Sequence, residues 1–259
     1  ARIGYVACDQ KIAKDRADVT VRAEVVSPAG GETTFAVALG DAKAAARVTL
    51  VPGTNTLALP VVVKNPRLWW PNGAGDQALY DLKVTVGDAT LARRIGLRTL
   101  EVVTTPDYGG EGLGLRIRVN GRDLLMKGAD WLPPSALLNQ QTPERVHDLI
   151  ASAAAANMNM LRVWGGGQFE GDAFYEACDR AGILLWHDCM FACARYPGYD
   201  DAFIAQVRAE MEHQLKRLHD HPALALWCGD NECIGAVSWF DVKQPVRDRY
   251  LANYLRINR

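Results

Sequence analysis

Apolar and polar residues alternate with a period of two along residues 1 to about 112. Such alternation predicts β-strands with one buried face, and turn residues separate the segments at Pro28–Gly31, Pro52–Gly53 and Pro71–Gly73. Short strands at this spacing, without any helical stripe, predict an immunoglobulin-like β-sandwich over residues 1–112. The predicted strands are Ala17–Ser27, Glu32–Gly40, Ala46–Val51, Asn55–Val63 and Ala78–Gly87.

The pattern changes from about residue 113. Asn120-Gly121 predicts a hairpin, and we place the first strand of a new sheet at Leu124–Lys127. Nearly continuous apolar strands then alternate with amphipathic helices, which predicts a parallel sheet with crossover helices. The later strands are predicted at Asn159–Trp164, Ile183–Asp188 and Leu224–Gly229, and the helices start near Thr142, Asp172, Phe203 and Val246.

Two architectures fit this alternation, namely a (β/α)₈ TIM barrel and an open doubly wound sheet. Neither a GxGxxG motif nor a P-loop follows the first strand, which disfavours nucleotide binding. The strand–helix units occupy about 145 residues, whereas a complete barrel takes about 250. We therefore expect residues 113–259 to form the N-terminal half of a barrel, and the chain to be a segment of a longer polypeptide.

Polar residues follow the predicted strands where the carboxyl ends meet. The last strand ends in LALWCGDNE (Leu224–Glu232), which places an amide and a carboxyl together at Asn231 and Glu232. That position suits general acid/base catalysis, although a Glu after a buried strand also serves as a helix cap or ion-pair partner. Arg162 could hold Glu232 or Asp188 by an ion pair as well as touch a ligand, and Asp188 could cap the next turn.

Composition excludes several classes of function. The 259 residues carry a net charge of -1, so no global field would attract nucleic acid or an anionic membrane. The six cysteines have no CxxC pair or zinc spacing and are predicted to be small buried side chains, so we predict neither a metal nor a cofactor. The N-terminus does not look like a signal peptide, and the compartment stays open between cytoplasmic and periplasmic or secreted.

Two adjacent tryptophans, Trp69 and Trp70, lie in a proline-bounded loop. Both cannot easily be buried in one sandwich. One interpretation is a loop that packs against a neighbouring domain. The alternative is a platform on which a sugar stacks, which would allow a non-catalytic carbohydrate-binding role.

Five strings together closely resemble β-mannosidases of glycoside hydrolase family 2, from about Asn65 to about Gly235. They are NPRLWWPNG, KGADWLP, MNMLRVWGGG, FYEACDRAGILLWHDCMFACARYP and HPALALWCGDNE. The resemblance implies a multidomain protein, of which this chain resembles the immunoglobulin-like domain and the first half of the catalytic barrel. The preceding domain and the second half of the barrel are expected in flanking parts of the same polypeptide.

The resemblance also implies roles for single residues. Glu232 matches the family's general acid/base, and Asn231 matches the residue that binds the sugar 2-hydroxyl. The other matched positions are the aromatic Trp131, in the loop after the first strand, and Trp164, with the polar Arg162, Asp188 and Asp130, all expected to bind substrate. The chain departs from the family's usual Asn at Asp130 and Asp230 and from its usual Gln at His187, whose charge the sequence leaves open.

The function implied is a retaining glycoside hydrolase that releases terminal β-D-mannose from the non-reducing ends of β-mannosides or manno-oligosaccharides. The family's nucleophile is a Glu that we expect beyond Arg259, so the isolated chain is expected to be inactive. The alternatives are another family 2 glycosidase, such as an endo-β-mannosidase or a β-glucosaminidase-like enzyme, and a non-catalytic carbohydrate-binding fragment.

Overall fold

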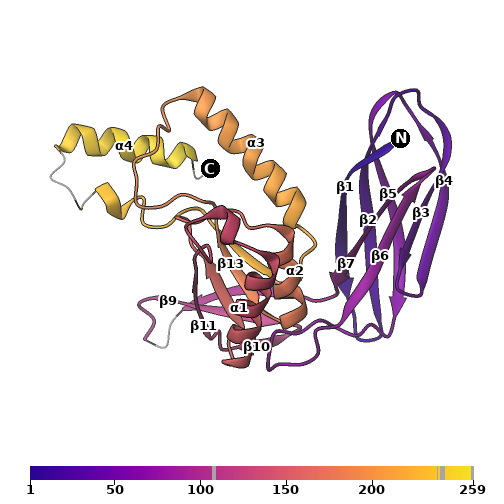
Figure 1. The fold of residues 1–259 in the computed structure, drawn as a ribbon, viewed down its shortest axis with the longest axis horizontal. Coiled ribbons are helices and arrows are strands. Elements are labelled where there is room, and N and C mark those ends of the chain that lie inside the picture. Colours follow the sequence, from indigo (N-terminus) through magenta and orange to yellow (C-terminus); the bar gives the residue numbers. More distant parts are fainter. Residues whose placement is uncertain (107–108, 238, 240–242, 258–259) are drawn as a thin grey trace. The chain divides into compact units, whose positions relative to one another are not determined.

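The computed structural model describes residues 1–106, 109–237, 239 and 243–257 and divides into two compact units (Figure 1). The first unit comprises Ala1–Met126 with the short segments Asp179–Gly182 and His219–Pro222. The second comprises Lys127–Cys178, Ile183–Leu218 and Ala223–Arg259.

Two antiparallel sheets form the larger part of the first unit. Their strand orders are β1-β2-β5 and β4-β3-β6-β7. The predicted strands are confirmed, and β1 and β7 are additional strands whose charged residues obscure the alternation. The bounds are β1 Arg2–Ile12, β2 Arg16–Ser27, β3 Gly31–Leu39, β4 Ala42–Leu50, β5 Gly53–Lys64, β6 Leu79–Val86 and β7 Ala89–Gly96.

One hydrophobic core joins these sheets, because buried residues of both belong to the same cluster. Val19 and Val21 of β2 contribute from one sheet, and Phe35 and Val84 of β3 and β6 from the other. Side chains alternate in and out along each strand, as in β2, so the period-two pattern is the cause of the sandwich-like arrangement. The immunoglobulin-like type stays a prediction.

A third antiparallel sheet, in the order β10-β9-β8, also belongs to the first unit. Its strands are β8 (Leu100–Pro106), β9 (Leu113–Val119) and β10 (Arg122–Leu124). The predicted Asn120-Gly121 hairpin is confirmed, since Arg122 pairs with Val119. Contacts divide the chain after Met126, whereas the domain bounds 1–112 and 113–259 stay a prediction for the intact protein.

The second unit contains a four-stranded parallel sheet in the order β11-β12-β13-β14. Its strands are β11 (Gly128–Trp131), β12 (Met160–Val163), β13 (Leu184–Asp188) and β14 (Leu224–Cys228). The parallel sheet is thus present, while its closure into a TIM barrel stays a prediction.

The predicted position of the first parallel strand, Leu124–Lys127, is wrong. The strand is Gly128–Trp131, and Leu125, whose apolar neighbours suggested a strand, is 80% exposed. Gly128 explains the difference, because a Cβ there would stand 1.7 Å from the Met160 carbonyl oxygen. Only glycine lets β11 approach β12 so closely, and Trp131 consequently ends the strand instead of lying in the following loop.

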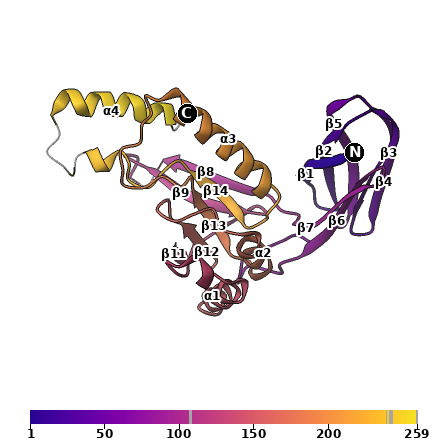
Figure 2. The same cartoon turned by 45° about the horizontal axis from the view of Figure 1, so that its top comes forward.

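The helices α1 (Pro143–Ala155) and α2 (Asp172–Ala181) lie on one face of the parallel sheet (Figures 1 and 2). The predicted start of α1 is confirmed: the Thr142 side chain accepts a hydrogen bond from the Arg145 N–H at 3.3 Å. The later helices are α3 (Asp201–Leu218) and α4 (Gln244–Ile257), with short 3₁₀ turns at Leu138–Gln140 and Gly235–Val237. None of these described helices is long and apolar enough to cross a membrane.

The two tryptophans of the Asn65–Gly73 loop differ in exposure. Trp69 is 0% exposed, and its indole N–H donates to the Asp179 carbonyl at 2.7 Å within the first unit. Trp70 is half-buried, and the Arg122 guanidinium lies over its ring. A buried ring offers no face to a sugar, so the interpretation of this loop as a stacking platform is wrong for Trp69.

Candidate functional site

The carboxyl ends of the parallel strands bring most of the predicted site residues to one edge of the sheet. Asp130 in β11 pairs in register with Arg162 in β12, which in turn pairs with Trp186 in β13. Asp188 ends β13, and the segment Asp230–Glu232 follows β14 closely. Because parallel strands point the same way, residues that end them meet at the same edge.

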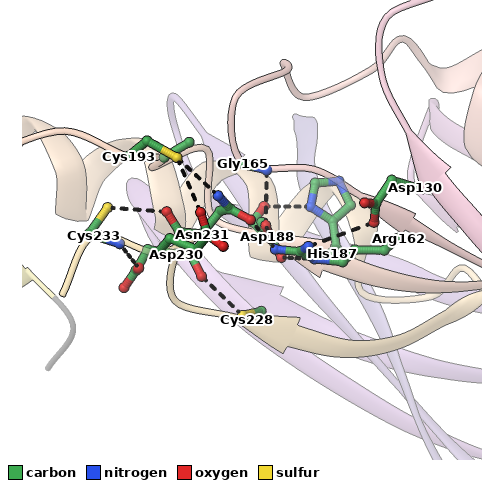
Figure 3. Close-up of polar contacts among 12 residues, drawn as sticks. Asp130, Arg162, Gly165, His187, Asp188, Cys193, Cys228, Asp230, Asn231 and Cys233 are labelled. Atoms are coloured by element: carbon green, nitrogen blue, oxygen red, sulfur yellow. Dashed lines mark hydrogen bonds and ion pairs between the residues drawn. The ribbon is translucent and has the colours of Figure 1, made fainter. Parts of the chain in front are cut away.

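Arg162 is the centre of the polar contacts at this edge (Figure 3). Its Nε and Nη2 donate to the two Asp188 carboxylate oxygens at 3.2 and 2.7 Å. Nη2 also donates to Asn231 Oδ1 at 2.8 Å, and Nη1 lies 3.7 Å from Asp130 Oδ1. Of the partners open to Arg162 from the sequence, Asp188 is therefore the one it holds, by the paired geometry that favours arginine.

The charge on Arg162 is stabilised. Burial lowers the pKa of its guanidinium, but the hydrogen bonds that it donates to Asp188 and the charges of Asp188 and Asp130 outweigh burial and raise it. Asp188 is completely buried and also accepts the Gly165 backbone N–H at 2.9 Å. A buried carboxylate requires such partners, and its position beneath Arg162 makes Asp188 a support for this edge.

Asn231 is held at both ends of its amide. Its Oδ1 accepts from Arg162, and its Nδ2 donates to Cys193 Sγ at 3.2 Å. Its backbone is paired as well: the Asn231 N–H donates to the Phe191 carbonyl at 2.8 Å, and the Cys193 N–H donates to the Asn231 carbonyl at 2.9 Å. These contacts add one more parallel bridge beyond the end of β13 and fix the orientation of the amide.

Glu232 follows directly and is exposed. Its φ of 58° lies in the left-handed region, which non-glycine residues rarely adopt and which often marks functional sites. Its Oε2 lies 3.7 Å from Cys193 Sγ. The edge thus presents the accessible carboxyl of Glu232 next to the Asn231 amide, which the Arg162 guanidinium holds in place.

Asp230 points its carboxylate into the turn. One oxygen accepts the Cys233 backbone N–H at 2.9 Å, and the other accepts the Tyr254 hydroxyl at 2.7 Å. The Tyr250 hydroxyl lies 3.0 Å from the Ala194 carbonyl and 3.1 Å from the Cys233 carbonyl. The spacing of two tyrosines in α4 is visible in the sequence, but their role in holding this turn is not.

The two predicted aromatic residues are placed differently. Trp164 is half-buried and follows β12, with its ring directly against Gly166. Trp131 is only 7% exposed, its indole N–H donates to Glu170 Oε1 at 3.0 Å, and its ring packs against Phe174 in α2. The structure therefore does not bring Trp131 into the polar cluster, although its carbonyl accepts the Trp164 N–H at 3.1 Å.

His187 is buried on the opposite side of β13, where its ring stacks with Phe169 and Tyr175. Burial lowers its pKa to about 4, so the ring is neutral at pH 7. Nδ1 lies 2.8 Å from the Asp188 carbonyl and Nε2 lies 2.9 Å from the Tyr175 hydroxyl. A neutral ring with its proton on Nδ1 satisfies both partners.

The described part of the chain has no group of three or more His, Cys, Asp or Glu side chains arranged to hold a metal ion. The chemistry that the edge itself offers is proton transfer by Glu232 and hydrogen bonding to a hydroxyl by Asn231. Both fit the roles that the resemblance implies, namely general acid/base for Glu232 and sugar binding for Asn231, and these roles stay predictions.

Comparisons with known proteins also match this chain to glycosidases. A family model described as "Glycosyl hydrolases family 2" matches residues 1–98. Beta-mannosidase B of Emericella nidulans is 36% identical over 90% of this chain and 28% of its own length. The beta-mannosidase of Capra hircus is 40% identical over 73% of this chain and 22% of its own length. The chain thus spans about a quarter of the length of these curated relatives.

Solved structures of glycosidases match this chain as well. The beta-D-mannosidase from Dictyoglomus thermophilum matches 98% of this chain and 33% of its own with a TM-score of 0.89 and 32% identity. The exo-chitosanase of Amycolatopsis orientalis matches 98% of this chain and 30% of its own with a TM-score of 0.73, but at 23% identity it shows only a shared fold.

Proposed function

Because the chain belongs to glycosyl hydrolase family 2, we propose that the intact polypeptide is a retaining glycoside hydrolase that releases terminal β-D-mannose from β-mannosides. The observation that carries this proposal is the edge of the parallel sheet, where Arg162 orders Asn231 beside the exposed carboxyl of Glu232. The names of the similar proteins support mannose as the sugar.

Glu232 acts as the general acid/base in this mechanism. In the first step its protonated carboxyl gives a proton to the glycosidic oxygen, so that the aglycone leaves as a neutral alcohol. In the second step its carboxylate takes a proton from the water that attacks the glycosyl-enzyme intermediate. The exposure of Glu232 gives both the glycosidic oxygen and the water access to it.

Asn231 binds the sugar. Its Oδ1 accepts from Arg162, and its Nδ2 has a second hydrogen besides the one directed at Cys193, which can be donated to substrate. We propose that this hydrogen binds the 2-hydroxyl of the mannosyl residue. Asp130, which is exposed beside Arg162, is proposed as a further hydroxyl ligand.

The aromatic side of the subsite is proposed to be Trp164, whose ring is partly accessible. Trp131, whose own ring is buried against Phe174, is proposed to act indirectly, through the hydrogen bond that its carbonyl accepts from the Trp164 N–H. This role replaces the direct sugar contact expected for Trp131 from the sequence.

A retaining mechanism needs a second carboxyl group, roughly 5–5.5 Å from the acid/base, to attack the anomeric carbon. The carboxylates described beside Glu232 have other partners: Asp130 and Asp188 pair with Arg162, and Asp230 holds the turn through Cys233 and Tyr254. We therefore propose that the nucleophile comes from another part of the intact polypeptide.

The test is a Glu232→Gln substitution in the intact polypeptide, assayed with an aryl β-mannoside. We expect kcat to fall by about 10²–10⁴-fold, because the amide cannot transfer the proton, while sugar binding is retained. Glu212→Gln, at an exposed position of α3, is the matched control and should keep full activity.

Unchanged turnover in the Glu232→Gln variant would contradict the proposal and favour a non-catalytic role. Comparing the aryl β-mannoside with an aryl β-glucosaminide and an internal mannosyl linkage of a glycan separates the alternatives within the family. Preferential hydrolysis of either of the last two substrates would replace the mannosidase assignment.

A further inference from the structure

Cys193 lies between the two side chains proposed to act on substrate. Its sulfur accepts a hydrogen bond from Asn231 Nδ2 at 3.2 Å and lies 3.7 Å from Glu232 Oε2 (Figure 3 shows its contact with Asn231). A thiol is both a weak acceptor and a weak donor, so its own hydrogen can be given to the carboxylate while it receives the amide hydrogen. One sulfur atom therefore contacts both functional groups at once.

The backbone that carries the sulfur is held next to Asn231. Phe191 and Cys193 pair with Asn231 through two backbone hydrogen bonds. Cys193 and Glu232 both have left-handed φ values, 50° and 58°, which cost non-glycine residues about 1 kcal/mol or more each and persist only where the surroundings impose them.

A second clamp acts just after these residues. The Tyr250 hydroxyl lies within hydrogen-bonding distance of the carbonyls of Ala194 and Cys233, which directly follow Cys193 and Glu232 in the chain. The two segments are thus joined before and after the point where the thiol meets the carboxyl. Their separation is consequently a property of the fold.

We propose that Cys193 is a positioning residue, whose thiol orients the Glu232 carboxyl through Oε2 and leaves the other carboxyl oxygen for the glycosidic oxygen of the substrate. The same sulfur keeps the Asn231 amide aligned for the sugar hydroxyl. This inference rests on the proposed glycosidase function, in which Glu232 is the acid/base.

The test compares Cys193→Ala with Cys193→Ser in the intact polypeptide. The readout is kcat/KM for a phenyl β-mannoside, whose poor leaving group needs protonation, and for a 2,4-dinitrophenyl β-mannoside, whose good leaving group needs little. We expect Ala to lower kcat/KM about 3- to 10-fold for the phenyl substrate and much less for the dinitrophenyl substrate, as the loss of one hydrogen bond implies. Ser, which keeps a donor and acceptor, should restore most of the loss, and Cys189→Ala is the matched control.

Equal losses for both substrates, no loss at all, or a loss that Ser does not restore would overturn the positioning role. These results differ from a failure of the proposed function. If the wild-type polypeptide hydrolyses no β-mannoside, or if Glu232→Gln is fully active, the function and this inference fail together. If Glu232→Gln is inactive and Cys193→Ala is unaffected, only the inference about Cys193 fails.

A thiol reagent gives an independent readout that does not depend on how the alanine variant folds. Of the six cysteines of this chain Cys193 alone is exposed: Cys189 and Cys228 are half-buried, and Cys8, Cys178 and Cys233 are buried. Methyl methanethiolsulfonate should inactivate the wild-type enzyme, dithiothreitol should restore it, and Cys193→Ser should resist. Loss of activity in the Cys193→Ser variant at the wild-type rate would contradict the proposal.

Discussion

Single residues at the edge of the parallel sheet take their charge state from burial and from their partners. Arg162 remains cationic because Asp188 and Asp130 offset its partial burial. His187 is buried without a carboxylate against its ring nitrogens, and burial lowers its pKa to about 4. The positive charge of Arg162 in β12 and the neutral ring of His187 in β13 therefore follow from local contacts, not from residue type.

The lowered pKa of His187 predicts a pH-dependent stability. Between pH 6.5 and about 4 the unfolded chain binds a proton at this residue that the folded protein does not bind. The free energy of unfolding should therefore fall as the pH falls through this window. The difference between the two pKa values corresponds to about 3 kcal/mol at most, at about 1.36 kcal/mol per pKa unit.

His187→Gln should remove this dependence, since Gln does not titrate and its amide can still donate to one partner and accept from the other. Urea unfolding of the intact protein at pH 7 and pH 5 measures the effect. We expect a smaller drop in stability between the two pH values for His187→Gln than for wild type, and an unchanged drop for His213→Gln, at an exposed position of α3. An equal drop in all three proteins would show that His187 is not responsible.

At the scale of elements, the Gly165–Gly167 run connects β12 to the wall of the proposed subsite. A Cβ at Gly165 would stand 2.3 Å from the Phe191 carbonyl oxygen, and a Cβ at Gly166 would stand 2.0 Å from the Trp164 ring. The absence of side chains thus lets the loop cross the edge closely enough for the Gly165 N–H to reach Asp188 and for the Trp164 ring to lie against Gly166.

Gly166→Ala tests this connection. The added methyl group must displace the Trp164 ring, so we expect KM for an aryl β-mannoside to rise several-fold and the tryptophan fluorescence to change. The matched control is Gly171→Ala, since a Cβ at Gly171 would meet nothing within 4 Å and should leave both readouts unchanged. Wild-type KM and fluorescence in Gly166→Ala would contradict the packing of Trp164 against this glycine.

At the scale of the whole molecule, the chain supplies a sandwich-like unit and a parallel sheet that carries Glu232, the proposed acid/base, and Asn231. It spans 22–28% of the length of the curated relatives it matches. The proposed retaining reaction needs a second carboxyl group besides Glu232, which we propose lies in another part of the intact polypeptide. The part of the proposed site that contains Asn231 and Glu232 is held in place by contacts within residues 127–257.

A purified chain of residues 1–259 is accordingly expected to show no hydrolysis of an aryl β-mannoside, because the described carboxylates beside Glu232 already have partners. The intact polypeptide, assayed in parallel, should be active. Circular dichroism of the purified chain should confirm that its strands and helices have formed. Measurable turnover by the purified chain, absent in its Glu232→Gln variant, would place the nucleophile within these residues.

Local sequence patterns were enough to predict most strands, the helices and the identity of the residues at the edge. Periodicity reports which face of a segment is apolar, and β2, α1 and β14 lie where it predicts them. Cap and turn residues act over a few positions, so the start of α1 and the Asn120-Gly121 hairpin were also predictable. The start of β11 could not be predicted from the pattern, because the close approach of Gly128 to Met160 depends on a neighbouring strand.

The contacts of the polar and aromatic residues at the edge could not be predicted from local patterns, because they join segments far apart in the sequence. The sequence offers Arg162 several partners, and the sheet register together with the burial of Asp188 selects one of them. The resemblance gives Trp131 and Trp164 the same role, yet Trp131 is buried against Phe174 of α2 and Trp164 is half-buried. The approach of Cys193 to Glu232 joins loops that are 39 positions apart, and no local pattern encodes such a distance.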